Sequence, residues 1–179
     1  MKQLLLLFSL MIILGCNSKS DQTTDTATDQ EQDLQLITAK DIDDLEYTEY
    51  VLGPDAKQAV INWQRYQELT MQIDYLKKAD FSFFGGENEL MMTFLKDLKD
   101  GIPQQIASPA IKERLIALET KLLKLHSTLK LSNSEKSELL NNIKELLVAT
   151  SNLHLQINKK FELESQIIED PTVDRTIQE

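Results

Sequence analysis

The sequence predicts an all-α protein, an antiparallel bundle of three long helices plus one shorter helix that follows a disordered N-terminal tether. Two observations predict this fold. Apolar residues recur at spacings of three and four over long stretches, which is the period of an α-helix, and no useful stretch alternates apolar and polar residues as a half-buried strand does. Short connections between the helical stretches favour antiparallel neighbours. We therefore expect a helical bundle domain over residues 38–169.

The first long helix is expected over residues 55–78. Gly53 and Pro54 punctuate the chain before it, and proline suits the first turn of a helix. No Gly or Pro interrupts this stretch, and its helical stripe comprises Ala59, Trp63, Tyr66, Thr70 and Ile73. The shorter helix is expected over residues 87–100, because Gly101 suits a helix C-terminus and Pro103 prevents continuation.

The remaining two helices are expected to form a tight hairpin. Ser108 and Pro109 provide an N-cap and a first-turn proline, and the stripe that follows is Ile111, Leu115, Leu118, Leu122, Leu125 and Leu129. A capping box of Ser132 and Glu135 would start the last helix, which could run to about Glu169. That helix is longer than its partner by about ten residues. Residues 34–52, or a partner protein, should therefore cover Phe161, Ile167 and Ile168 on the overhang.

The N-terminus has the character of a secretory signal. Lys2 is followed by Leu4 to Leu14, eleven residues that are apolar except for one serine. A membrane-spanning helix needs about 20 apolar residues, so this stretch has the size of a signal-peptide core instead. It ends in Ile13-Leu14-Gly15-Cys16, which resembles the lipobox of bacterial lipoproteins, although Ile stands where Leu is usual.

The resemblance implies that residues 1–15 are removed and that the Cys16 thiol forms a thioether to a diacylglycerol. Several acyl chains together anchor a protein firmly, whereas a single chain binds reversibly. Asn17 stands where an aspartate would imply retention in the inner membrane, so the resemblance favours the outer membrane, on its periplasmic or its surface face. The alternative is an ordinary signal peptide followed by a chance cysteine.

Residues 16–37 are expected to be a lipid anchor and a disordered acidic tether. Residues 17–33 contain no aliphatic residue larger than Ala and no aromatic residue, so they cannot bury enough apolar surface to offset the entropy of ordering. Residues 41–46 begin like a calcium loop, but Glu46 replaces the required glycine, so a solvated charge run is favoured. Asp170-Pro171 stops the last helix, and the tail, residues 170–179, is polar and expected to be mobile.

Composition excludes several classes of site. A net charge of −10 argues against an electrostatic nucleic-acid binder. One Cys and two His exclude a disulfide framework and a Cys-rich zinc site. His126 and His154 should lie about 22 Å apart by helix rise, too far to share a metal. We expect no metal, no cofactor and no catalytic constellation, although a haem or ligand pocket lined by Met91, Phe94 and His126 stays an alternative.

One aromatic cluster is a candidate site. Phe81, Phe83 and Phe84 precede Gly85-Gly86 in a break between helices. The favoured interpretation is that they pack into the end of the bundle core. The alternative is that they form an exposed loop that docks a partner, because aromatic residues contribute much of the binding energy at interfaces.

These observations predict a lipid-anchored envelope protein, not an enzyme, that acts by binding another envelope protein as an adaptor, assembly factor or inhibitor. It would contact the membrane through the anchor at Cys16 and would not bind nucleic acid. The alternative is a helical bundle that binds a small ligand or haem. A carboxylate-dependent enzyme is a third hypothesis, which a buried pair of acids on facing helices would support.

Replacing the anchor cysteine tests the first of these predictions. Cys16→Ala should release the protein from membranes or block signal removal, because alanine has no thiol to take the lipid. Membrane fractionation and intact-mass measurement check both effects. A variant that is processed and still sediments with membranes would contradict the anchor.

Overall fold

The computed structural model describes residues 37–167. The chain divides into two units, residues 1–32 and 33–179, and every described residue belongs to the second. The predicted signal peptide, Cys16, the tail and nearly all of the tether lie outside the described residues.

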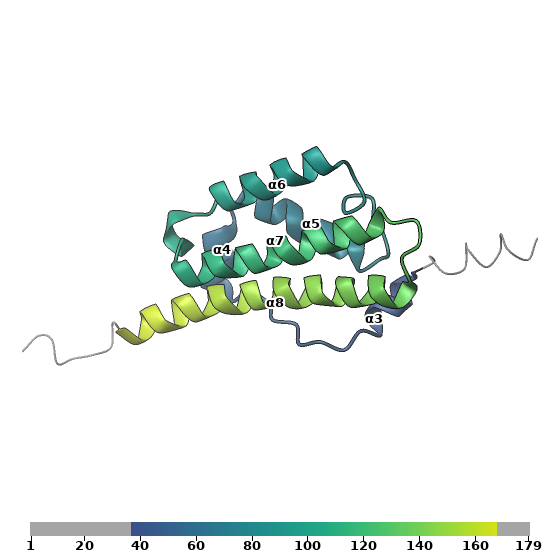
Figure 1. The fold of residues 1–179 in the computed structure, drawn as a ribbon. Helices are drawn as coiled ribbons and strands as arrows, with labels where there is room; N and C mark the ends of the chain where they lie inside the picture. The colour runs from purple at the N-terminus through teal and green to yellow at the C-terminus, as the bar shows by residue number, and fades with distance from the viewer. Residues whose placement is uncertain (1–36, 168–179) are drawn as a thin grey trace, which may run out of the picture. The chain divides into compact units, whose positions relative to one another are not determined.

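The described part of the chain is all-α, as the sequence predicts, and residues 37–167 contain no strand. Figure 1 shows the arrangement of the helices. In chain order they are α3 (Ala39–Asp43), α4 (Pro54–Val60), α5 (Gln64–Leu76), α6 (Asn88–Asp100), the 3₁₀-helix η2 (Gln104–Ile106), α7 (Pro109–Leu129) and α8 (Lys136–Ile167). None of these helices is long and apolar enough to cross a membrane.

The prediction of one continuous helix over residues 55–78 is wrong. The chain leaves the helix at Ile61 and starts a new one after Trp63, so α4 and α5 are separate. Trp63 turns into the core, where it is 1% exposed and its indole N–H donates to the Leu98 carbonyl at 3.0 Å. The Gln67 side chain donates to the Val60 carbonyl at 2.8 Å and so satisfies the end of α4. Burial of the indole therefore replaces one helical turn, and the described chain has two long helices instead of three.

The two long helices, α7 and α8, form the predicted hairpin. The Ser108 hydroxyl caps α7 by accepting from the Ile111 N–H. Asn142 of α8 donates to the Thr128 hydroxyl of α7 at 2.9 Å, which fixes the antiparallel register close to the turn. The last helix starts later in the chain than the predicted capping box at Ser132 implies, because α8 begins at Lys136. The hairpin interface is fully buried at Leu118, Leu122, Leu125, Ile143 and Leu146.

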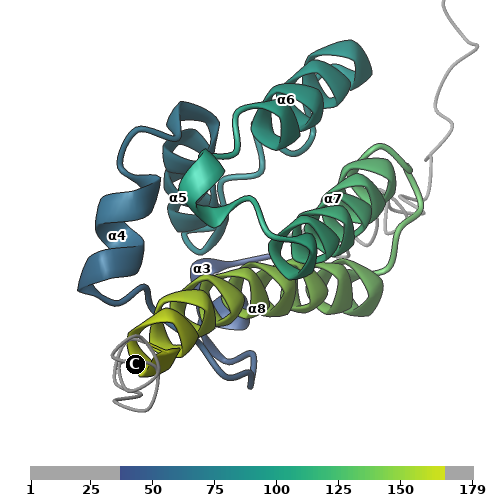
Figure 2. The ribbon, with the colours of Figure 1, turned by 90° about the vertical axis from the view of Figure 1, so that its left-hand side faces the viewer.

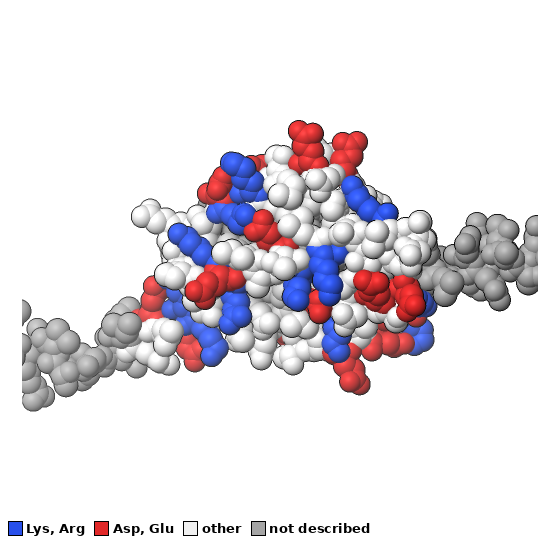
Figure 3. All heavy atoms as spheres, in the orientation of Figure 1, with Lys and Arg blue, Asp and Glu red and all other residues white. Residues whose placement is uncertain are grey.

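The shorter helices pack around this hairpin. α4 contacts α8, α6 contacts α7, and α5 contacts α6, so that α4, α5 and α6 lie together on one side in Figure 2. On the face seen in Figure 3, basic and acidic side chains are interspersed, and neither sign forms a large patch. Lys99 and Glu119 form one such pair of opposite charges, 2.7 Å apart, in the described part of the chain.

A segment without helix, residues 44–53, connects α3 to α4, and we call it the strap. It runs along α8 (Figure 1). At its beginning, the Asp41 carboxylate of α3 pairs with Lys136 of α8 at 2.9 Å. At its end, Gly53 contacts Asn158, close to the part of α8 where Phe161 is half-buried. Residues 34–52 were expected to cover this end of the last helix, and the strap approaches it as far as Asn158.

Candidate functional site

Three polar side chains on one face of α8 hold the strap. Ser151, His154 and Asn158 are spaced by three and four residues, so they point the same way from the helix. The Ser151 hydroxyl accepts from the Tyr50 N–H at 2.7 Å and donates to the Thr48 carbonyl at 2.8 Å. Both hydrogen-bonding functions of this serine are thus used to bind the main chain.

Asn158 binds the next part of the strap in the same way. Its side-chain oxygen accepts from the Gly53 N–H at 2.9 Å, and its side-chain nitrogen donates to the Val51 carbonyl at 2.8 Å. A main-chain segment that is neither helix nor strand needs other partners for its polar groups, and these side chains supply them.

His154 joins the strap to α5. Its Nδ1 lies 2.9 Å from the Tyr50 carbonyl oxygen, and its Nε2 lies 2.8 Å from the Tyr66 hydroxyl. Because a carbonyl only accepts, Nδ1 carries the proton and Nε2 accepts from the tyrosine. Burial lowers the pKa of His154 below its ordinary value, and burial raises the pKa of Tyr66 to about 12. Both side chains are therefore neutral at pH 7, with their mutual hydrogen bond formed.

A surface hollow of about 470 Å³, the strap groove, lies between the strap and helices α4 and α5. Its aliphatic wall is formed by Val51, Leu52, Val60 and Ile61. Val51 and Ile61 are 72% and 56% exposed, so this wall presents apolar surface to water. The pair of Tyr66 and His154 also lines the groove, so the hydrogen bonds that fix the strap also shape its surface.

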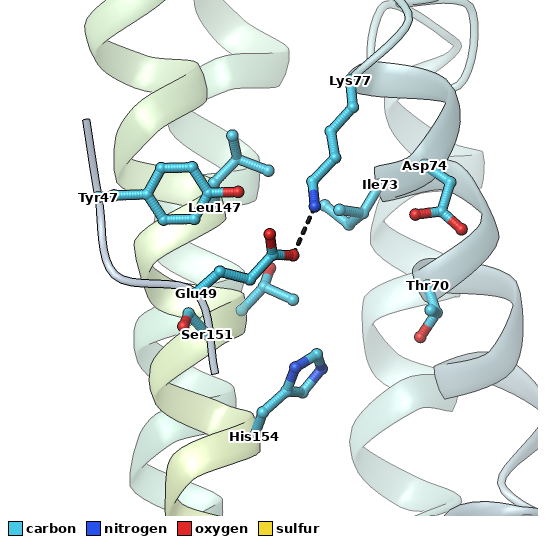
Figure 4. A pocket seen from close by; sticks show the side chains of 10 residues that line it. Tyr47, Glu49, Thr70, Ile73, Asp74, Lys77, Leu147, Ser151 and His154 are labelled. Atoms are coloured by element: carbon cyan, nitrogen blue, oxygen red, sulfur yellow. Dashed lines mark hydrogen bonds and ion pairs between the residues drawn. The ribbon is translucent and has the colours of Figure 1, made fainter. Parts of the chain in front are cut away.

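A smaller hollow of about 60 Å³ adjoins the groove. Figure 4 shows Glu49 reaching from the strap toward Lys77, the C-cap residue of α5, and the two groups form an ion pair at 2.5 Å. His154 and Thr70 line both hollows. A volume of this size suits a few water molecules, so the larger groove is the candidate for a ligand.

The predicted docking loop contributes mainly to the core. Phe84 is fully buried, and Phe83 packs edge-to-face against it and against Phe94, with ring centroids 5.1 and 4.9 Å apart. Phe81 is half-buried and lines a separate hollow of about 200 Å³ at the turn of the hairpin, beside Leu131, which is 52% exposed. Docking of a partner at this end of the molecule stays a prediction.

The two histidines lie in different surroundings. The ring Nδ1 of His126 lies 2.7 Å from the Phe84 carbonyl, and its Nε2 is buried with no hydrogen-bond partner among the described residues. Met91, Phe94 and His126 are all buried in the core. Within residues 37–166 no acidic side chain is buried, and no group of three or more His, Cys, Asp or Glu could hold a metal ion.

Sequence reasoning did not find the strap groove. Its one local signal is the polar series Ser151, His154 and Asn158 on a helix whose inward positions are mostly apolar. Such a series indicates that the helix face contacts main-chain polar groups, but it does not tell which segment supplies them.

No protein-family model, no curated protein and no solved structure matches this chain. The geometry of the site is therefore the basis for its function.

The titration of His154 should make stability depend on pH. Burial lowers the pKa of His154 in the folded protein, so the unfolded state, with a histidine pKa near 6.5, binds the proton more readily. This contribution to stability is complete above about pH 6.5 and is lost as pH falls through the folded-state pKa. Urea unfolding from pH 7.5 to 5 should show a steeper loss of unfolding free energy for the wild type than for His154→Gln. Parallel pH profiles would contradict this role.

Proposed function

We propose that the protein is a lipid-anchored protein of the bacterial envelope that acts by binding, and that the strap groove is its binding site for a small apolar ligand. In this proposal residues 1–15 are a signal peptide and Cys16 carries the lipid. The outer membrane is the expected location, because Asn17 is not an aspartate.

The observation that supports ligand binding is the groove itself. Its volume of about 470 Å³ falls within the range of about 300–1,000 Å³ that is typical of small-molecule sites. Its aliphatic side chains Val51 and Ile61 are exposed to water. Covering apolar surface of this kind stabilises a complex by about 25 cal/mol for each Å² removed from water.

Residues around the groove also hold its walls in place. Ser151, His154 and Asn158 hold one wall through main-chain hydrogen bonds, and buried Trp63 fixes the turn that carries Ile61. A preformed site loses little conformational entropy on binding, so less of the binding free energy is offset.

A second candidate function is protein docking, as an adaptor, assembly factor or inhibitor. The observation that favours it is the hollow at the hairpin turn, where half-buried Phe81 lies beside exposed Leu131. Apolar and aromatic side chains that are accessible at one end of a domain are typical of interaction surfaces.

Recovery of the bound molecule tests the primary proposal. The lipidated full chain is purified from envelopes in membrane nanodiscs, and small molecules are extracted from it and identified by mass spectrometry. The groove variant is Ile61→Asp, and the matched control is Ile116→Asp, because Ile116 is 57% exposed on α7 and does not line the groove.

We expect one small apolar molecule with the wild type and with Ile116→Asp, and at least about tenfold less of it with Ile61→Asp, since a charge on the wall opposes apolar contact. Recovery that is equal in all three proteins would contradict ligand binding in the groove. A stoichiometric protein that is lost with Phe81→Asp, with no small molecule present, would favour the second candidate.

A further inference from the structure

The strap groove contains one basic group that has no partner. The Lys57 side chain lines the groove from α4, and its ammonium makes no ion pair or hydrogen bond with any residue of the described part of the chain. The acidic group of the groove, Glu49, is already paired with Lys77. The charge that remains at this apolar surface is therefore positive, although the whole chain has a net charge of −10.

We propose that the strap groove binds a linear acyl chain that ends in a carboxylate, a free fatty acid in chemical terms. The chain lies along the aliphatic wall between Val51 and Ile61, and the carboxylate meets the Lys57 ammonium. This inference rests on the proposed function, and it names the class of ligand for that site.

The interior of the groove favours an aliphatic body over a polar one. The Tyr66 hydroxyl is bonded to His154, the Thr70 hydroxyl donates to the Tyr66 carbonyl at 3.0 Å, and the Gln67 amide donates to Val60. A polar ligand would have to compete with these bonds and would lose its own bonds to water. Methylene groups form no hydrogen bonds that must be replaced, and each one that is buried contributes about 0.8 kcal/mol to the binding free energy.

The head group follows from the single ammonium. Lys57 is a compact point charge, and no arginine lines the groove. Phosphate and sulfate groups are commonly held by arginine forks, which the lining residues do not supply. One lysine at the edge of an aliphatic groove matches a head group with a single negative charge, and a carboxylate is the simplest of these.

Methyl NMR on the lipidated full chain in nanodiscs tests the proposal. The valine and isoleucine methyl groups carry ¹³C, so that Val51 and Ile61 report on the groove and Ile116 reports on a surface outside it. Three probes share one chain length and differ in charge: dodecanoate, dodecanol and dodecylamine. Because the nanodisc takes up each probe equally in every variant, comparison between variants isolates binding by the protein.

With dodecanoate we expect saturable shifts of the Val51 and Ile61 methyl signals and none at Ile116. Lys57→Gln should weaken dodecanoate binding about threefold, as expected for loss of an exposed ion pair, and should leave dodecanol unchanged. Lys112→Gln is the matched control, because Lys112 is an exposed lysine of α7 that does not line the groove. Dodecylamine should bind more weakly than dodecanol.

Two results would overturn the inference. If dodecanoate does not shift Val51 and Ile61, the groove is not a fatty-acid site. If Lys57→Gln leaves dodecanoate binding unchanged, or if dodecylamine binds best, the carboxylate assignment is wrong. In either case the groove can still yield a different apolar molecule by extraction, so failure of this inference is distinguishable from failure of the proposed function.

Discussion

The structure beside the groove depends on hydrogen bonds between side chains of α8 and the main chain of the strap. The strap has no helix of its own, so its polar groups need partners when it packs on the protein. Ser151, His154 and Asn158 provide five such bonds, each between 2.7 and 2.9 Å long. This pairing fixes the course of the strap main chain along α8, and one wall of the groove follows from it.

The opposite wall depends on a second long-range interaction. The indole of Trp63 is buried against the Leu98 carbonyl, so the chain must turn between α4 and α5. The turn leaves Ile61 at the surface and Val60 buried, with both beside the groove. A continuous helix would have carried these two residues to other positions around its axis. Burial of a single aromatic side chain thus sets where the aliphatic wall lies.

Local signals were enough to predict much of the fold. The apolar series from Ile111 to Leu129 and the Ser108-Pro109 start both act within a few residues, and α7 follows them closely. The break at Trp63 depends on a residue 35 positions away, and the strap bonds join residues more than 100 positions apart. No local pattern contains that information. For the same reason, the sequence alone indicated the aromatic cluster of Phe81, Phe83 and Phe84. It did not indicate that Val51 and Ile61 are exposed beside Lys57.

Amide hydrogen exchange of the strap tests the central claim most directly, because the strap contains both hydrogen-bonded and unbonded N–H groups. The Tyr50 and Gly53 N–H groups donate to Ser151 and Asn158, whereas the Glu49 and Val51 N–H groups donate to no described residue. After correction for intrinsic rates, Tyr50 and Gly53 should exchange at least about tenfold more slowly than Glu49 and Val51. Equal and fast exchange at all four positions would show that α8 does not hold the strap.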